Sequence, residues 1–86
     1  MKTFVIYDIS DDRLRNKVFE ACKDYGLAHV QYSMFFGEMT HNRREEIYLK
    51  IKRILGQRPG RVVIAPICDK DLRLIKTIDT YIETEA

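Results

Sequence analysis

The stretch FVIYDISDDRLRNKV, residues 4–18, sets the first strand and the first helix of this chain. It begins with aromatic and β-branched residues, which are typical of a strand, and that strand ends on Asp8. Ser10 or Asp11 can then cap a helix whose first turn carries acids. A carboxylate at the tip of a central strand is costly unless it is solvated, paired or bound. The role of Asp8 is therefore the first question that this sequence raises.

The first helix is indicated by apolar residues at the spacing of one helix face, and Gly26 ends it. Residues 27–39 predict two short strands, or one strand broken near residues 31–33. The apolar residues on the expected inner face of this helix are Leu14, Val18, Ala21, Cys22 and Tyr25.

The second half of the chain also predicts a helix followed by a strand. Asn42 is the expected cap of a second helix, with Glu45 completing a capping box. Residues 61–68 read as a further strand. The order of elements predicts an α+β fold, a ferredoxin-like βαββαβ sandwich. Pro66 fits this fold because the last strand of the motif lies at an edge of the sheet, where proline is tolerated.

The strands are apolar on both sides, as in FVIY, MFF and VVIA. Such strands need both faces of their sheet covered, and two helices cover only one face. We therefore expect a second copy to pack face to face on the other, as a homodimer with a two-fold axis. The tail, residues 72–86, is long enough for an extra C-terminal strand that pairs with the partner chain. A loosely packed terminal helix is the alternative for this tail.

Length and composition favour a single domain over residues 1–86. No apolar run approaches the roughly 20 residues that span a bilayer, and the N-terminus does not resemble a secretory signal. We expect a cytoplasmic protein without membrane contact, whose Cys22 and Cys68 are buried, inert thiols. Residues 41–61 hold seven Lys or Arg against two Glu, which indicates either a polyanion partner or a solvated helix face.

In a single chain, Asp8 can have a purely structural role, as the cap of the turn into the first helix. In a two-fold dimer whose axis passes near the strand tips, Asp8 would meet Asp8 of the other chain. A divalent cation relieves the repulsion between two such carboxylates. Mg²⁺, for which Mn²⁺ can substitute, needs few carboxylates when substrate phosphates and waters complete its shell. Arg13 and Arg15 are close enough in sequence to bind those phosphates.

The stretches YDISDDRLRNKV and GLAHVQYSMFFGEM resemble the small CRISPR-associated protein of the spacer-acquisition pair, the Cas Two family. The resemblance covers nearly the whole chain, and it implies a ferredoxin-like homodimer in which Asp8 is the catalytic residue and the metal ligand shared by the two chains. It also implies magnesium-dependent cleavage of RNA or DNA in some members, and a bridging role between dimers of the larger integrase. The motif residues that support the match are Tyr7, Gln31, Ser33 and Phe35, beside Asp8, Arg13, Arg15 and Gly26.

Two functions from different classes follow. The first is an adaptor, a homodimer that bridges the larger CRISPR integrase while new spacers are captured and inserted. The second is a magnesium-dependent endonuclease acting on single-stranded RNA or duplex DNA. A toxin-like metal-dependent ribonuclease of the same fold is a further alternative, and an RNA-recognition module is disfavoured because QYSMFFGE lacks the pattern of stacking aromatics. The candidate nucleic-acid contacts are Arg13, Arg15, Arg43, Arg44, Lys50 and Arg53.

Overall fold

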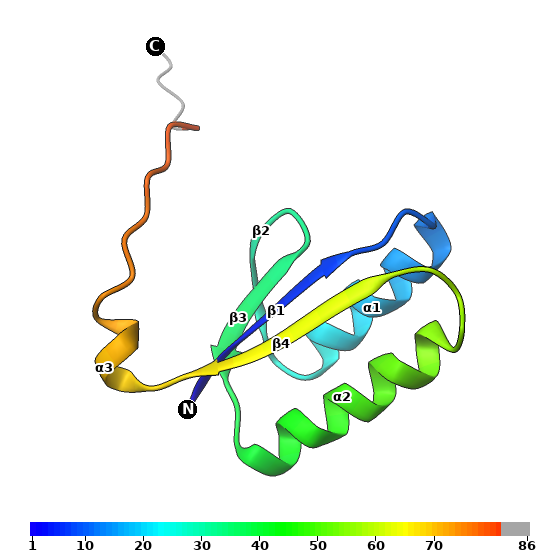
Figure 1. Cartoon of the computed structure of the whole chain (residues 1–86), viewed down its shortest axis with the longest axis horizontal. Coiled ribbons are helices and arrows are strands. Elements are labelled where there is room, and N and C mark those ends of the chain that lie inside the picture. Colours follow the sequence, from blue (N-terminus) through cyan, green and yellow to red (C-terminus); the bar gives the residue numbers. More distant parts are fainter. Residues whose placement is uncertain (82–86) are drawn as a thin grey trace.

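The computed structural model describes residues 1–81 and has an α+β architecture, a four-stranded sheet backed by two helices (Figure 1). All neighbouring strands are antiparallel, in the order β2-β3-β1-β4. This order of elements confirms the predicted βαββαβ sandwich. The elements are β1 (Lys2–Asp8), α1 (Asp12–Asp24), β2 (Ala28–Gln31), β3 (Met34–Glu38), α2 (His41–Leu55), β4 (Arg61–Ile67) and a short α3 (Asp69–Leu72).

Helix α1 begins as the sequence predicts. The carboxylate of Asp11 accepts a hydrogen bond from the backbone N–H of Leu14 at 2.9 Å, which satisfies one of the free donors of the first turn. This bond lowers the pKa of Asp11, because it favours the charged carboxylate. The helix ends before Gly26, whose φ of +81° lies in the left-handed region that glycine adopts readily.

Helix α2 begins two residues earlier than the Asn42 cap predicts. Thr40 is the cap, and its hydroxyl accepts a hydrogen bond from the backbone N–H of Arg43 at 3.2 Å. Asn42 cannot be the cap because it already lies within the helix, which begins at His41. At the other end, Arg58 donates to the backbone carbonyl of Ile54 at 2.6 Å and so satisfies one of the last free carbonyls.

The strand pair β2 and β3 is split by a tight turn, which confirms the predicted break near residues 31–33. Ser33 has a φ of +61° there, and its carbonyl accepts a hydrogen bond from the backbone N–H of Tyr7 at 3.0 Å. Strand β4 pairs only with β1 and lies at the edge of the sheet. The predicted edge position of Pro66 is therefore confirmed, and it pairs across from Thr3.

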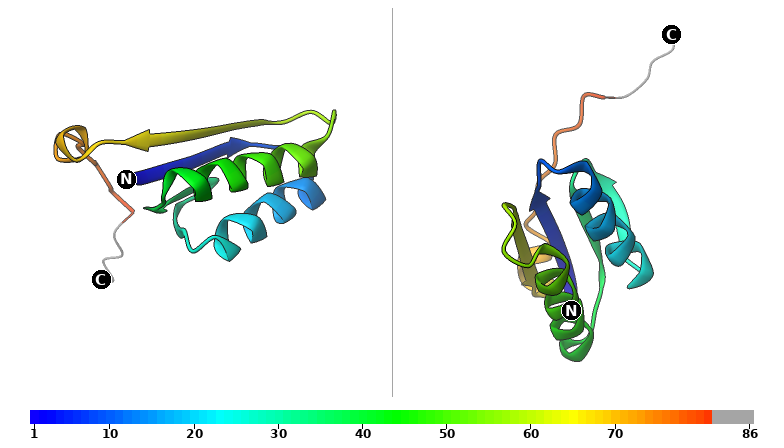
Figure 2. Two further views of the ribbon diagram at one scale, coloured as in Figure 1. Left: turned by 90° about the horizontal axis from the view of Figure 1, so that it is seen from below. Right: turned by 90° about the vertical axis from the view of Figure 1, so that its right-hand side faces the viewer.

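The core lies between the sheet and the two helices, which cover the same face (Figure 2). Alternate residues of β1, namely Thr3, Val5 and Tyr7, point into it. Phe35 is fully buried at its centre. The remaining buried apolar side chains are Ile9, Leu14, Val18, Ala21, Cys22, Leu27, Met39, Ile47 and Ile51.

The prediction of two buried cysteines is half wrong. Cys22 is buried in α1, and this burial raises the pKa of its thiol to about 12. Cys68 is exposed, because it follows β4 at the point where the chain leaves the sheet.

After α3 the tail continues outside the sheet, with which residues 73–81 form no strand pair (Figure 1). Residues 73–81 form no strand in the single chain, and the short helix α3 was not predicted. Whether the tail forms a strand against a partner chain stays a prediction, and its last part, residues 82–86, lies outside the described residues. Within residues 1–81, no helix has the length and apolar character needed to cross a membrane.

Candidate functional site

The face of the sheet opposite the helices is apolar. Its central strand presents Phe4 and Ile6, and the register places Phe36 and Ala65 beside Phe4, with Met34 and Val63 beside Ile6. The Phe4 and Phe36 rings lie 4.6 Å apart between centroids. Ile6 and Val63 are both exposed on this face, at 40% and 48%. We call this surface the open face.

The tail borders the open face across a cavity of about 660 Å³. Phe4, Met34 and Phe36 line one side of this cavity, and Ile75 and Ile78 line the other. Ile78 is 92% exposed and Leu74 is 68% exposed, so the tail presents apolar side chains that the single chain leaves largely in solvent.

Asp8 lies at the end of the open face. It is the last residue of β1 and follows Ile6 on the same side of the strand, since alternate residues share a face. Its side chain is exposed, and among the described residues it takes part in no ion pair. Asp8 lines a cavity of about 220 Å³ together with Ser10, Pro59, Gly60 and Arg61. The carboxylate is thus available to a ligand from outside the chain.

Arg61 is the residue that the sequence interpretation missed. It is the first residue of β4, and the antiparallel register places it directly opposite Asp8. The signal was available: an edge strand that starts after RPG and runs antiparallel to β1 must begin where β1 ends. The predicted ferredoxin-like order implies this register, in which the first residue of the last strand pairs with the last residue of the first strand.

The described residues of one chain do not complete a metal site. No group of three or more His, Cys, Asp or Glu side chains is placed to hold an ion within residues 1–81. An exposed carboxylate is nevertheless a suitable ligand for Mg²⁺, which typically keeps several waters and takes further oxygens from phosphates. Asp8 is therefore a candidate ligand of such an ion, and its role in metal binding stays a prediction.

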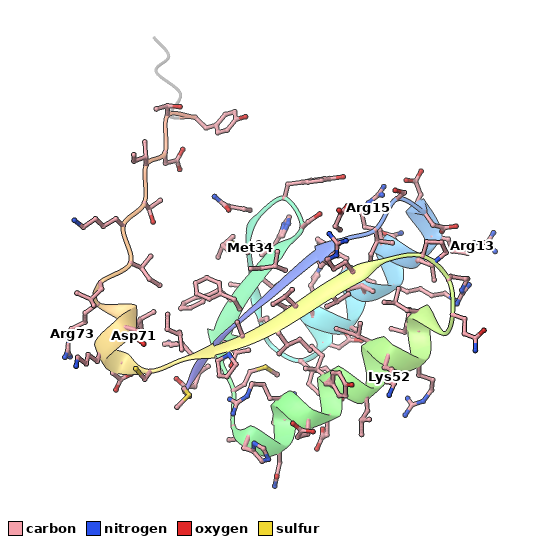
Figure 3. The ribbon with its side chains drawn as sticks, in the orientation of Figure 1. Arg13, Arg15, Met34, Lys52, Asp71 and Arg73 are labelled. Carbon is pink, nitrogen blue, oxygen red and sulfur yellow. The ribbon has the colours of Figure 1, made fainter. Side chains whose placement is uncertain are left out.

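The turn between β1 and α1 is held by Arg15. Its guanidinium donates to the backbone carbonyls of Ile9 at 2.9 Å and Ser10 at 3.2 Å, and it forms an ion pair with Asp12. Arg15 therefore supports the turn that follows Asp8, and its contact with phosphate stays a prediction. Arg13 lies in the first turn of α1, as Arg15 does. Its side chain is exposed, and it lies at the same end of the molecule as Arg15 (Figure 3).

A small polar pocket of about 110 Å³ lies beside this turn. Tyr7, Arg15, His29, Tyr32 and Ser33 line it, together with Asn16 and Phe19. Burial is the main cause of the raised pKa of Tyr7.

The other motif residues lie apart from this pocket. Phe35 belongs to the core, where its ring contacts those of Phe19 and His29. Gln31 lines the tail cavity instead. The predicted motif residues therefore divide between the core, the small pocket and the open face.

The predicted basic contacts on α2 do not form one surface. Arg43 and Lys50 both lie over the ring of Tyr25, at 4.3 Å and 6.0 Å from its centroid. Arg44 is turned inward, where it donates to the backbone carbonyl of Met39 at 3.3 Å. Arg53 is exposed on the same helix.

Lys50 and Arg13 meet at a groove between the two helices. This groove has a volume of about 370 Å³ and also contains Lys17, Glu20 and Asp24. Because acids share it, its charge is mixed. The structure thus brings Lys50 together with Arg13 in this groove and with Arg43 over the Tyr25 ring, on the helix side of the sheet, whereas Asp8 lies on the open face.

Comparison with known proteins gives a consistent result. A family model described as CRISPR associated protein Cas2 matches residues 1–75. A CRISPR-associated endoribonuclease Cas2 from Desulforudis audaxviator is 65% identical over 79 residues, which are 92% of this chain and 74% of that protein. A protein of the same name from Korarchaeum cryptofilum is 45% identical over 74 residues, which are 86% of this chain and 80% of that protein.

Two solved structures share the fold. The crystal structure of Streptococcus pyogenes Cas2 at pH 6.5 matches with a TM-score of 0.75 and 21% identity, over 92% of this chain and 100% of that chain. A hypothetical protein from Thermus thermophilus matches with a TM-score of 0.71 and 30% identity, over 78% and 80% of the two chains.

Proposed function

Since this chain belongs to the CRISPR associated protein Cas2 family, we propose that it acts in CRISPR adaptation as a homodimer with a metal-dependent endoribonuclease site centred on Asp8. The observation that carries this proposal is the position of Asp8, exposed and without an ion-pair partner among the described residues, at the end of an apolar sheet face that the helices leave open. The names of its relatives support endoribonuclease activity.

The open face supports the dimer. Its apolar side chains, with those of the tail, would be buried by a second copy related by a two-fold axis. Such an axis near the tip of β1 would bring Asp8 of both chains to one place.

Two of the chain's own residues have roles at such a site. Asp8 holds the ion, and Arg15 fixes the turn that follows. When bound, Mg²⁺ would supply Lewis acidity to a phosphate oxygen and lower the pKa of an attacking water. Single-stranded RNA is the expected substrate, with duplex DNA as the comparison.

The test is cleavage of labelled single-stranded RNA by the parent and by Asp8→Asn in Mg²⁺. Asp8→Asn keeps the size of the side chain and removes the charge that holds the ion, so we expect a loss of at least about 100-fold. Asp71→Asn is the matched control, because it makes the same charge change on α3, at the far end of the molecule from Arg13 and Arg15 (Figure 3). Equal cleavage by the parent and Asp8→Asn would refute the assignment, and cleavage in excess chelator would refute the role of the metal.

A second role, as adaptor for the larger CRISPR integrase, is favoured by the tail. Leu74, Ile78 and Tyr81 are among its exposed apolar side chains, as in a segment that folds against a partner. This role requires a dimer body, basic surfaces and the tail, but not Asp8. In a spacer-acquisition assay with the integrase, Asp8→Asn should therefore remain active, and a chain truncated after Asp71 should not. Loss of acquisition by Asp8→Asn with an intact integrase complex would instead make cleavage central.

A further inference from the structure

Arg61 lies beside the candidate metal ligand and has no assigned role. The register of β1 and β4 pairs it directly with Asp8, and Ile6 with Val63 one step before. Side chains of directly paired residues lie on the same face of a sheet, so both groups project from the open face. Arg61 is exposed, and no hydrogen bond or ion pair of its side chain occurs among the described residues.

The backbone around Arg61 is closely fixed. Gly60 packs so tightly that an added Cβ would lie 3.3 Å from Ile9 and 3.3 Å from Leu55. Pro59, two residues before Arg61, has its own backbone angle φ fixed by the proline ring. The start of β4 is therefore held against the end of β1 from the helix side, while Arg61 itself stays free toward the open face. Its position next to Asp8 follows from packing and does not depend on an ion pair between them.

At the tip of β1 a positive charge lies beside Asp8, which the sequence analysis did not consider. A carboxylate alone would need a cation when its two-fold mate approaches, but each Asp8 has a guanidinium across the sheet. Arg61 thus places a positive charge beside Asp8, and its guanidinium, which makes no ion pair within residues 1–81, is left to bind an anion within reach.

We propose that Arg61 is a phosphate-binding residue of this site, whose guanidinium takes a phosphodiester of the nucleic acid beside Asp8. A guanidinium presents paired N–H donors that match the oxygens of a phosphate. The cavity of about 220 Å³ shared by Asp8, Ser10 and Arg61 provides space for such a group. The expected effect on metal binding rests on the proposed function, whereas the phosphate role does not.

The experiment measures two affinities in Arg61→Ala, namely for RNA and for Mn²⁺. Binding of a fluorescent single-stranded RNA is measured in chelator at several salt concentrations, with duplex DNA of equal length as a second arm. Mn²⁺ binding is measured without nucleic acid by electron paramagnetic resonance. The matched control is Lys52→Ala, because it also removes one positive charge but lies on α2, which covers the opposite face of the sheet (Figure 2). Arg61→Lys, which keeps the charge, guards against a folding defect.

Arg61→Ala should weaken RNA binding roughly tenfold or more, and it should lower the slope of log affinity against log salt by about 0.7 for each lost phosphate contact. It should also strengthen Mn²⁺ binding by about three- to tenfold, because a neighbouring positive charge is gone. Opposite changes in the two affinities would not result from a general structural defect. Arg61→Lys should keep the salt slope, and Lys52→Ala should change neither affinity by more than about twofold.

Unchanged binding and salt slope for both RNA and duplex DNA in Arg61→Ala would overturn the phosphate role, as would an equal loss in Lys52→Ala. Weaker Mn²⁺ binding in Arg61→Ala would overturn the placement of its positive charge beside the ion. If the parent binds no Mn²⁺ while Arg61→Ala still loses RNA affinity, the metal site fails and the phosphate site stands. A loss confined to duplex DNA would assign the same phosphate site to DNA.

Discussion

A lysine at position 6 tests the open face as a dimer interface. Ile6 lies at the centre of this face, between Met34 and Val63, and is 40% exposed in the single chain. Full burial of an isoleucine side chain is worth about 1.5–3 kcal/mol, so covering the remaining exposed part contributes roughly 1 kcal/mol per chain. The two-fold axis doubles this to about 2 kcal/mol.

Ile6→Lys removes that contribution and places a charge in each half of the interface. An unpaired buried charge costs several kcal/mol, of which part is recovered when the lysine reaches solvent at the edge. We therefore expect a total loss of at least about 3 kcal/mol, which raises the dimer dissociation constant more than roughly 100-fold. In the folded monomer the same change should cost little, because the position is already partly in water.

The assay is sedimentation equilibrium over a range of protein concentrations, with circular dichroism as a check on folding. Leu49→Lys is the matched control, since Leu49 is an aliphatic residue of α2 that is 52% exposed on the helix layer. We expect a monomeric Ile6→Lys and a dimeric Leu49→Lys. A dimer that Ile6→Lys leaves intact would refute the reasoning, and a dimer that only Leu49→Lys disrupts would place the interface on the helices.

Three further predictions concern the single chain. Phe35→Ala should lower the free energy of unfolding by about 3–5 kcal/mol, measured by urea denaturation, because its fully buried ring fills the centre of the core; a loss below about 1 kcal/mol would contradict that packing. In the native protein Cys68 should react with a thiol reagent, whereas Cys22 should react only after unfolding, since it is buried and its pKa is raised to about 12; labelling followed by mass spectrometry distinguishes them. Because the pKa of Asp11 is lowered, mainly by its hydrogen bond from the backbone of Leu14, its stabilising effect should be fully present above about pH 4 and should decline as pH falls below it. Asp11→Ala should therefore flatten the acid limb of stability against pH, and an unchanged limb would count against this cap.

The fold could be predicted from sequence because its signals are local. The strand composition of β1, the apolar stripe of α1 and the left-handed Gly26 each depend on neighbouring residues. The cap of α2 was predicted at Asn42 rather than Thr40, because both residue types accept the required hydrogen bond and only the backbone path decides between them.

The site could be predicted only in part, because its partners come from distant parts of the chain. Asp8 was found from its unusual place at a strand end. Arg61 was missed because its place opposite Asp8 depends on the register between β1 and β4. Arg15 was assigned to nucleic acid from its nearness to Asp8 in the sequence and Arg44 from its charge, and neither signal shows that their guanidinium groups already bind backbone carbonyls.

The measurement that tests the central claim most directly is the stoichiometry of Mn²⁺ binding to the dimer. A carboxylate shared across the two-fold axis predicts one ion for every two chains, and it predicts that Asp8→Asn abolishes this binding while the protein stays dimeric. Titration followed by electron paramagnetic resonance, with sedimentation equilibrium on the same samples, gives both quantities. One ion for each chain, or unchanged binding in dimeric Asp8→Asn, would contradict the shared site.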